Sequence, residues 1–82
     1  MSADNAIYIR ELPNHKFAVD CISSFYPDDL TDEQIDESFQ NLETFDTLNE
    51  AWEEEERIQQ QYDEDGNYIE YGTEVLLRKN KQ

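Results

Sequence analysis

The feature that most constrains this chain is a block of negative charge over residues 28–74. The block holds 18 acidic residues and one basic residue, Arg57, for a net charge of -17 (1 - 18). Residues 1–27 add -1 (2 - 3) and residues 75–82 add +3, giving the -15 of the whole chain. Charge of this density opposes compaction through self-repulsion, so a chain that folds despite it is expected to gain solubility or a basic partner. Nucleic acid and anionic membranes are excluded as direct partners.

The length predicts a single domain over residues 1–82 with frayed ends at residues 1–5 and 79–82. A chain of 82 residues buries only about 60 to 65% of its unfolded surface, so the core is expected to be thin. Aromatic residues still make up 12% of the chain, more than a disordered segment usually carries. The composition therefore predicts a fold.

No run of about 18 apolar residues is present, and residues 1–9 lack the basic and apolar regions of a signal peptide. We expect a cytoplasmic protein. A single cysteine, Cys21, cannot form an internal disulfide and is predicted to be an inert buried thiol. His15 has no second histidine or cysteine nearby, and two glycines are too few for a phosphate-binding loop. The sequence predicts no enzyme, no metal site and no cofactor.

Two segments near the start of the chain have the pattern of β-strands. Ile7 and Ile9 alternate within residues 6–12, and Phe17, Val19 and Cys21 alternate within residues 16–25. Residues 12–15 contain a Pro-Asn break, so the two segments are predicted to form an antiparallel hairpin. A third strand is expected over residues 68–77, after turn-forming residues at 63–67.

The segment between these strands carries two signals for helix initiation. Thr31 and Gln34, and again Thr47 and Glu50, have the spacing of a capping box. An apolar stripe follows each box, and Trp52 falls on the second stripe as a predicted core residue. Two helices are expected, although a single bent helix over residues 32–62 remains an alternative.

The order strand, strand, helix, helix, strand predicts an α+β fold. We expect a small antiparallel sheet of about three strands, with one or two helices on one face. A thin core and the apolar run at residues 75–77 leave both a monomer and a homodimer open.

The acidic residues of the predicted helices form the candidate partner-binding surface. Carboxylates at positions i and i+4 lie about 6 Å apart along a helix, close to the spacing of phosphates along a nucleic acid strand. A merely solvated face is the alternative reading. The candidates are Asp32, Glu33, Asp36, Glu37, Glu43, Glu50, Glu53, Glu54, Glu55 and Glu56.

In length, in its acids over residues 28–74 and in its α+β pattern, the chain resembles the small acidic inhibitors that phages encode against host nucleic-acid enzymes. That class includes anti-CRISPR, anti-restriction and DNA-glycosylase inhibitor proteins. The resemblance implies a DNA-mimicking inhibitor without chemistry of its own, bound to a basic nucleic-acid-binding protein such as a CRISPR effector or restriction enzyme. No motif assigns a particular family, so no contact residues carry over.

Two further patterns compete with this interpretation. Tyr68 and Tyr71 are candidate interface residues, because tyrosine is common where binding energy concentrates. They would suit an adaptor or small subunit of a phage or plasmid assembly, whose acidity serves solubility. Four oxygen-bearing residues also match the offsets of a calcium loop, although glycine does not stand where such a loop requires it. These are Asp63, Asp65, Asn67 and Glu74.

Overall fold

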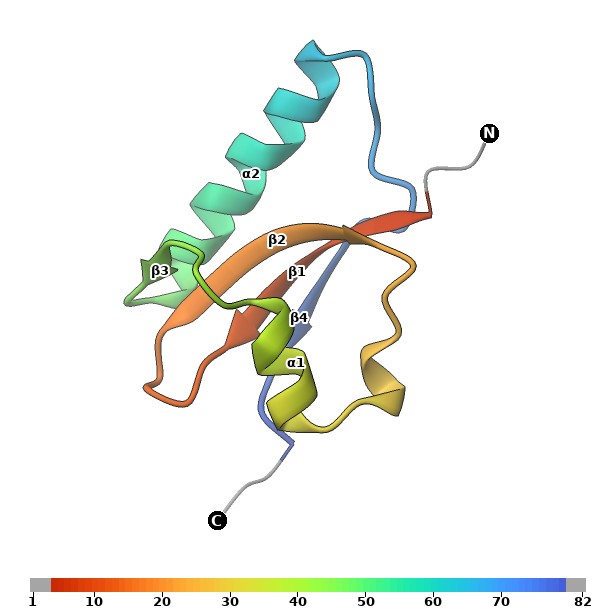
Figure 1. The fold of residues 1–82 in the computed structure, drawn as a ribbon. Helices are drawn as coiled ribbons and strands as arrows, with labels where there is room; N and C mark the ends of the chain where they lie inside the picture. The colour runs from red at the N-terminus through yellow and green to blue at the C-terminus, as the bar shows by residue number, and fades with distance from the viewer. Residues whose placement is uncertain (1–3, 80–82) are drawn as a thin grey trace.

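The computed structural model describes residues 4–79 and confirms the α+β class. A four-stranded sheet in the order β3-β2-β1-β4 forms the centre of the protein (Figure 1). The strands are β1 (Asn5–Glu11), β2 (Phe17–Ser23), β3 (Thr44–Phe45) and β4 (Thr73–Leu76). The helices are the 3-10 turn η1 (Pro27–Asp29), α1 (Asp32–Ser38) and α2 (Leu48–Glu64).

The predicted hairpin is present. β1 and β2 pair antiparallel, with Ile7 opposite Cys21 and Ile9 opposite Val19. The Leu12 N–H donates to the Lys16 carbonyl at 2.8 Å and closes the turn. The second strand ends at residue 23, two residues before the predicted end.

β4 differs from its prediction in both direction and length. It pairs with β1 in parallel, with Ile7 opposite Thr73, so the sheet is mixed rather than antiparallel. Residues 68–72 form a connection, held by Asn5: its Nδ2 donates to the Tyr68 carbonyl at 3.3 Å, and its Oδ1 accepts from the Glu70 N–H at 2.8 Å. Because this connection crosses the start of β1, the chain enters β4 at the same end and must run parallel to β1.

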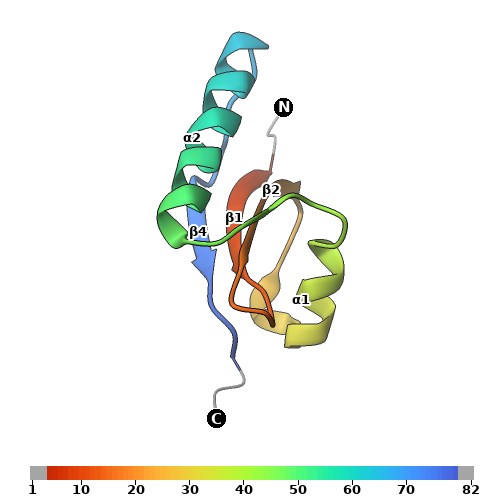
Figure 2. The ribbon, with the colours of Figure 1, turned by 90° about the vertical axis from the view of Figure 1, so that its left-hand side faces the viewer.

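The two helices cover opposite faces of the sheet, whereas the sequence had predicted one face (Figure 2). Side chains alternate between the faces of a strand, and β1 is apolar at successive positions, so both faces need cover. On the α2 side the buried cluster is Ile7, Ile9, Val19 and Ala51. On the α1 side it is Ala6, Tyr8, Ala18, Ile35, Phe39 and Leu76.

Residues 32–62 form two helices, separated by β3. Both predicted capping boxes are present: Thr31 Oγ1 accepts from the Gln34 N–H at 3.2 Å, and Thr47 Oγ1 accepts from the Glu50 N–H at 3.1 Å. α2 ends at Glu64, and Gly66 just beyond its C-cap has a φ of 80°, which favours glycine. The local signals therefore placed the starts of both helices correctly.

A buried arginine joins α1 to the sheet and to the segment after β4. Arg10 Nε donates to Asp36 Oδ1 at 3.0 Å, and Arg10 Nη2 lies 3.0 Å from Asp32 Oδ1. Arg78 Nη1 also contacts Asp36 at 3.0 Å, and the Lys79 N–H donates to Asp32 at 3.1 Å. The side chain of Arg78 and the backbone of Lys79 thus bind the acids of α1.

The predicted frayed ends fall mainly outside the described residues, which exclude 1–3 and 80–82. Asn5 is buried in β1, and Lys79 Nζ donates to the Pro27 and Leu30 carbonyls at 2.9 and 2.6 Å. The described structure therefore includes two residues of the predicted N-terminal end, Asp4 and Asn5, and one of the C-terminal end, Lys79. Within residues 4–79 no helix has the length and apolar character needed to cross a bilayer.

Candidate partner-binding surface

Because α1 and α2 lie on opposite faces of the sheet (Figure 2), the candidate acids fall into two groups. One group belongs to α1, and the other belongs to α2 and to the segment that precedes it. The two groups must therefore be judged separately.

The α1 group has only two carboxylates directed to solvent. Asp32 is buried and Asp36 is half-buried, and both take part in the Arg10 cluster. Glu33 and Glu37 are exposed. Asp32 and Asp36 therefore stabilise the fold and are poorly placed to contact a partner.

The glutamate run 53–56 in α2 contains side chains with different surroundings. Glu55 is buried, and its Oε2 accepts hydrogen bonds from Thr73 Oγ1 and Gln59 Nε2, each at 2.6 Å. Glu55 therefore links α2 to β4. The remaining glutamates of the run are exposed at 53 and 56 and half-buried at 54.

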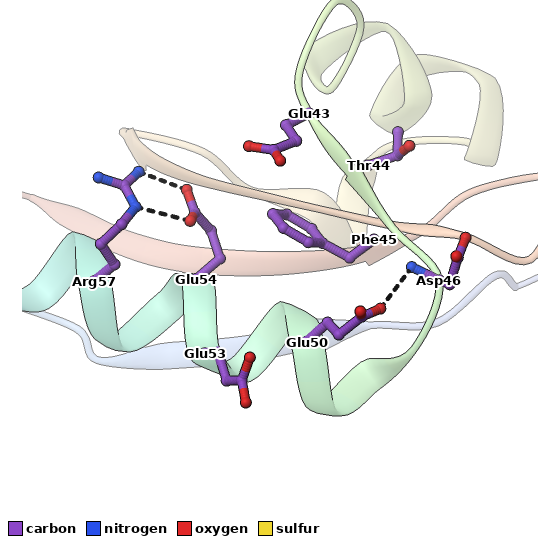
Figure 3. A pocket seen from close by; sticks show the side chains of 8 residues that line it. All are labelled: Glu43, Thr44, Phe45, Asp46, Glu50, Glu53, Glu54 and Arg57. Carbon is purple, nitrogen blue, oxygen red and sulfur yellow. Dashed lines mark hydrogen bonds and ion pairs between the residues drawn. The ribbon is translucent and has the colours of Figure 1, made fainter.

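Glu54 forms an ion pair on this surface. Its carboxylate accepts from Arg57 Nε at 2.8 Å and from Arg57 Nη2 at 2.6 Å (Figure 3). The hydrogen bonds from Arg57 lower the pKa of Glu54 below its ordinary value of 4.5. Arg57 lies three residues after Glu54, so the pair is made within α2.

Acidic side chains from α2 and from residues 43–46 surround an open hollow of about 460 Å³, which we call the acidic hollow (Figure 3). In this view the side chain of Glu43 lies above Phe45 and that of Glu54 lies to its left, whereas Glu53 points away from it (Figure 3). The hollow is lined by Glu43, Thr44, Phe45, Asp46, Glu50, Glu53, Glu54 and Arg57.

The acidic hollow is strongly negative. Its lining has five acids and one base, a net of -4 (1 - 5), and the base is already paired with Glu54. Lys16 Nζ lies 3.2 Å from Asp46, but both side chains are largely exposed, and such pairs contribute little. Glu50 accepts from the Thr47 N–H as part of the helix cap. A basic group from a partner would find unpaired negative charge here.

The aromatic candidates are more exposed than the helical stripe suggested. Trp52, predicted to be in the core, is 39% exposed, because α2 turns the adjacent Ala51, together with Glu55 and Ile58, toward the sheet. Tyr68 and Tyr71 are 56% and 65% exposed. Both lie in the connection before β4 rather than on a strand.

A second hollow brings Tyr71 together with Tyr26, which lies at the end of the hairpin segment and could serve either the core or an interface on sequence grounds. Tyr26 is 64% exposed and, with Tyr71, lines an open hollow of about 290 Å³, which we call the aromatic hollow. The two residues are 45 positions apart (71 - 26), so no local pattern could pair them. The lining residues are Asp4, Asn5, Ala6, Tyr8, Phe25, Tyr26 and Tyr71.

The residues that match the calcium-loop offsets are not arranged as a loop. Asp63 lies in the last turn of α2 and Glu74 lies in β4. Among residues 4–79, no group of three or more histidine, cysteine or acidic side chains is placed to hold a metal ion.

Cys21 is half-buried on β2. Burial raises the pKa of its thiol, although contact with the Tyr62 hydroxyl acts in the opposite direction. A raised pKa keeps the thiol protonated and weakly nucleophilic at neutral pH.

The chain gives no match to family models, to curated proteins or to solved structures. Its function is therefore inferred from the two hollows and the charges around them.

Proposed function

We propose that this protein is a non-enzymatic inhibitor that presents a DNA-like acidic surface to the basic nucleic-acid-binding groove of a host defence or DNA-processing protein. A CRISPR effector or a restriction enzyme is the kind of target meant. A phage-encoded protein of this type would act in the host cytoplasm. The contact surface consists of the acidic hollow and the exposed glutamates of α2.

The proposal is supported by one observation above all: this surface has no unpaired base. Arg57, the single basic residue of residues 28–74, is held by Glu54. Glu43, Glu53 and Glu56 are exposed around it. An ordinary helix surface mixes both signs of charge, which relieves repulsion between neighbours at i and i+4. A surface of one sign is what a basic groove would recognise.

Charge complementarity of this kind has a measurable consequence. It accelerates association with a basic partner, and the effect weakens as salt screens the charges beyond about 8 to 10 Å. Binding should therefore fall steeply with ionic strength, as the binding of DNA to the same groove does.

Two matched triple variants test the proposal. E43Q/E53Q/E56Q removes three exposed charges from the acidic hollow and α2. D29N/E33Q/E37Q removes three exposed charges from η1 and α1, near the opposite face of the sheet. Both variants remove the same number of negative charges, so a difference in binding between them reports where the partner binds.

The tagged protein is used to recover partners from a bacterial lysate, and each partner is then tested for displacement of a labelled DNA duplex. We expect a basic nucleic-acid-binding partner from which this protein displaces the duplex. The α2 variant should compete at least about tenfold less well than the α1 variant, which corresponds to about 1.4 kcal/mol. Equal competition by both variants, or a partner with no nucleic-acid groove, would contradict the proposal.

The exposed aromatic side chains favour one alternative. Trp52, Tyr26, Tyr68 and Tyr71 all reach solvent, as expected for a non-catalytic adaptor that binds through aromatic contacts. Such binding should be nearly indifferent to salt. A partner retained at high ionic strength, and lost on replacing these residues by alanine, would support the adaptor.

A further inference from the structure

The aromatic hollow lies apart from the acidic hollow. Tyr8 and Ala6, which line it, belong to the buried cluster on the α1 side of the sheet. The acidic hollow is formed by α2 and the β3 segment. A partner group bound in the aromatic hollow would therefore make a contact that the acidic surface does not provide.

The walls of the aromatic hollow are held in place by the surrounding structure. The Tyr71 N–H donates to the Asn5 carbonyl at 2.9 Å, and the Asp29 N–H donates to the Tyr26 carbonyl at 3.2 Å. At the base, the Tyr8 hydroxyl donates to the Phe25 carbonyl at 3.3 Å, and the two rings meet edge to face with centroids 5.0 Å apart. The backbone of Tyr26 and Tyr71 and the contact between Tyr8 and Phe25 are thus fixed before any ligand binds.

Negative charge surrounds these aromatic walls. Asp4 lines the hollow, where its Oδ2 accepts from Ser24 Oγ at 2.7 Å. Burial raises the pKa of Tyr8, and the charges of Glu74 and Asp4 raise it further. The charge of Glu70, followed by that of Asp4, raises the pKa of Tyr71. None of the residues between 4 and 79 that line the hollow is basic, so these residues favour a cation.

We propose that the aromatic hollow binds an arginine side chain of a protein partner, with the guanidinium against Tyr26 and Tyr71 and beside Asp4. A guanidinium is planar, stacks on aromatic rings and is more weakly hydrated than the ammonium of lysine. The volume of about 290 Å³ lies at the lower limit for small-molecule sites, which suits one side chain rather than a cofactor.

The inference rests on the proposed function only in taking the partner to be a basic protein. The binding itself needs no nucleic-acid groove, and it can be tested on the isolated protein. The probe is a capped Gly-Arg-Gly peptide, with two matched peptides in which citrulline or lysine replaces the arginine. Citrulline keeps the shape of arginine and removes its charge.

The peptides are titrated while the ring signals of Tyr8, Tyr26 and Tyr71 are followed by NMR. We expect saturable shifts of these signals with the arginine peptide, binding at least about tenfold weaker with citrulline, and several-fold weaker with lysine. Shifts confined to the acidic hollow would overturn the proposal. Equal binding of the lysine peptide would overturn the choice of arginine.

Three variants locate the site. Tyr71→Ala and Asp4→Asn should each weaken binding of the arginine peptide about fivefold or more, and asparagine tolerates the positive φ of 50° at position 4. Tyr68→Ala is the matched control, since Tyr68 is an exposed tyrosine of the same connection outside the hollow. An equal loss with Tyr68→Ala, or none with Asp4→Asn, would contradict the proposal.

The two proposals can fail separately. E43Q/E53Q/E56Q should leave binding of the arginine peptide in the aromatic hollow unchanged, because these residues do not line it. Failure of duplex displacement together with intact peptide binding would reject the DNA mimic alone. Intact displacement without ring shifts would reject the arginine site alone.

Discussion

Arg10 and Asp32 form an ion pair inside the protein, with Nη2 and Oδ1 3.0 Å apart and side chains 0% and 8% exposed. Arg10 also donates to the carbonyls of Asp32 and Leu77, at 3.3 and 3.4 Å. These bonds satisfy the guanidinium where water cannot reach it. A buried charge is tolerated only with such partners, so the pair should be sensitive to loss of either member.

Replacing Arg10 by leucine should lower the free energy of unfolding by about 3 to 5 kcal/mol, because it leaves the carboxylate of Asp32 buried without its cation. Urea unfolding followed by fluorescence gives the measurement. Arg10→Leu combined with Asp32→Asn should recover part of this loss. A loss below about 1 kcal/mol in the single variant would contradict a contribution of this size from the Arg10–Asp32 pair.

Adjacent glutamates in α2 should differ sharply in their contribution to stability. Glu55→Ala removes the acceptor of Thr73 and Gln59, and we expect a loss of about 2 kcal/mol, the usual cost for hydrogen bonds to a charged group. Glu56→Ala, at an exposed position, should change stability by no more than about 0.5 kcal/mol. Thermal unfolding of both variants makes the comparison, and equal effects would contradict it.

Tyr62 should make the protein sensitive to alkali. Contact with Cys21, followed by burial, raises the pKa of Tyr62 from 10.0 to about 12. A pKa raised in the folded state adds stability below pH 10, and that stability is lost as the pH rises from 10 toward 12. The urea midpoint should therefore fall over this range, and it should fall less in Tyr62→Phe. The same pH dependence in both proteins would argue against this role.

Salt should stabilise the folded protein while it weakens partner binding. The net charge of -15 opposes the compact state, and added salt screens that repulsion. We expect the melting temperature to rise between about 0.05 and 0.5 M sodium chloride. Glu53→Gln should reduce the rise slightly, since it removes one of the exposed charges. A melting temperature that falls with salt would indicate that attractive pairs outweigh the repulsion.

Short-range signals in the sequence were sufficient for the hairpin and for both helix starts. Thr31 with Gln34, and Thr47 with Glu50, act within one turn, so tertiary structure does not alter them. The direction of β4 depends on hydrogen bonds from Asn5 to a segment more than 60 residues away, which no local pattern encodes.

The candidate site could be predicted only in part. A run of four glutamates gives no indication of which carboxylate is buried, because that depends on how α2 is rotated over the sheet. The rotation buries Ala51 and Glu55 and leaves Trp52 exposed. Asp32 and Asp36 likewise bind Arg10, with Asp32 buried and Asp36 half-buried, and the charge of Arg10 gave no indication that its side chain would be buried. The meeting of Tyr26 and Tyr71 is a product of the tertiary fold alone.

The parallel pairing of β1 with β4 has a consequence for how the protein forms. Ile7 pairs with Thr73, which is made 66 residues later (73 - 7), so the outer edge of β1 stays uncovered until then. During synthesis on the ribosome that edge is a template on which another nascent chain could add a strand. The residues made in between include 17 of the 18 acids of the block (18 - 1, because Glu74 follows Thr73), and their charge keeps two such chains apart. The charge that we assign to partner recognition thus also protects the unfinished sheet from aggregation.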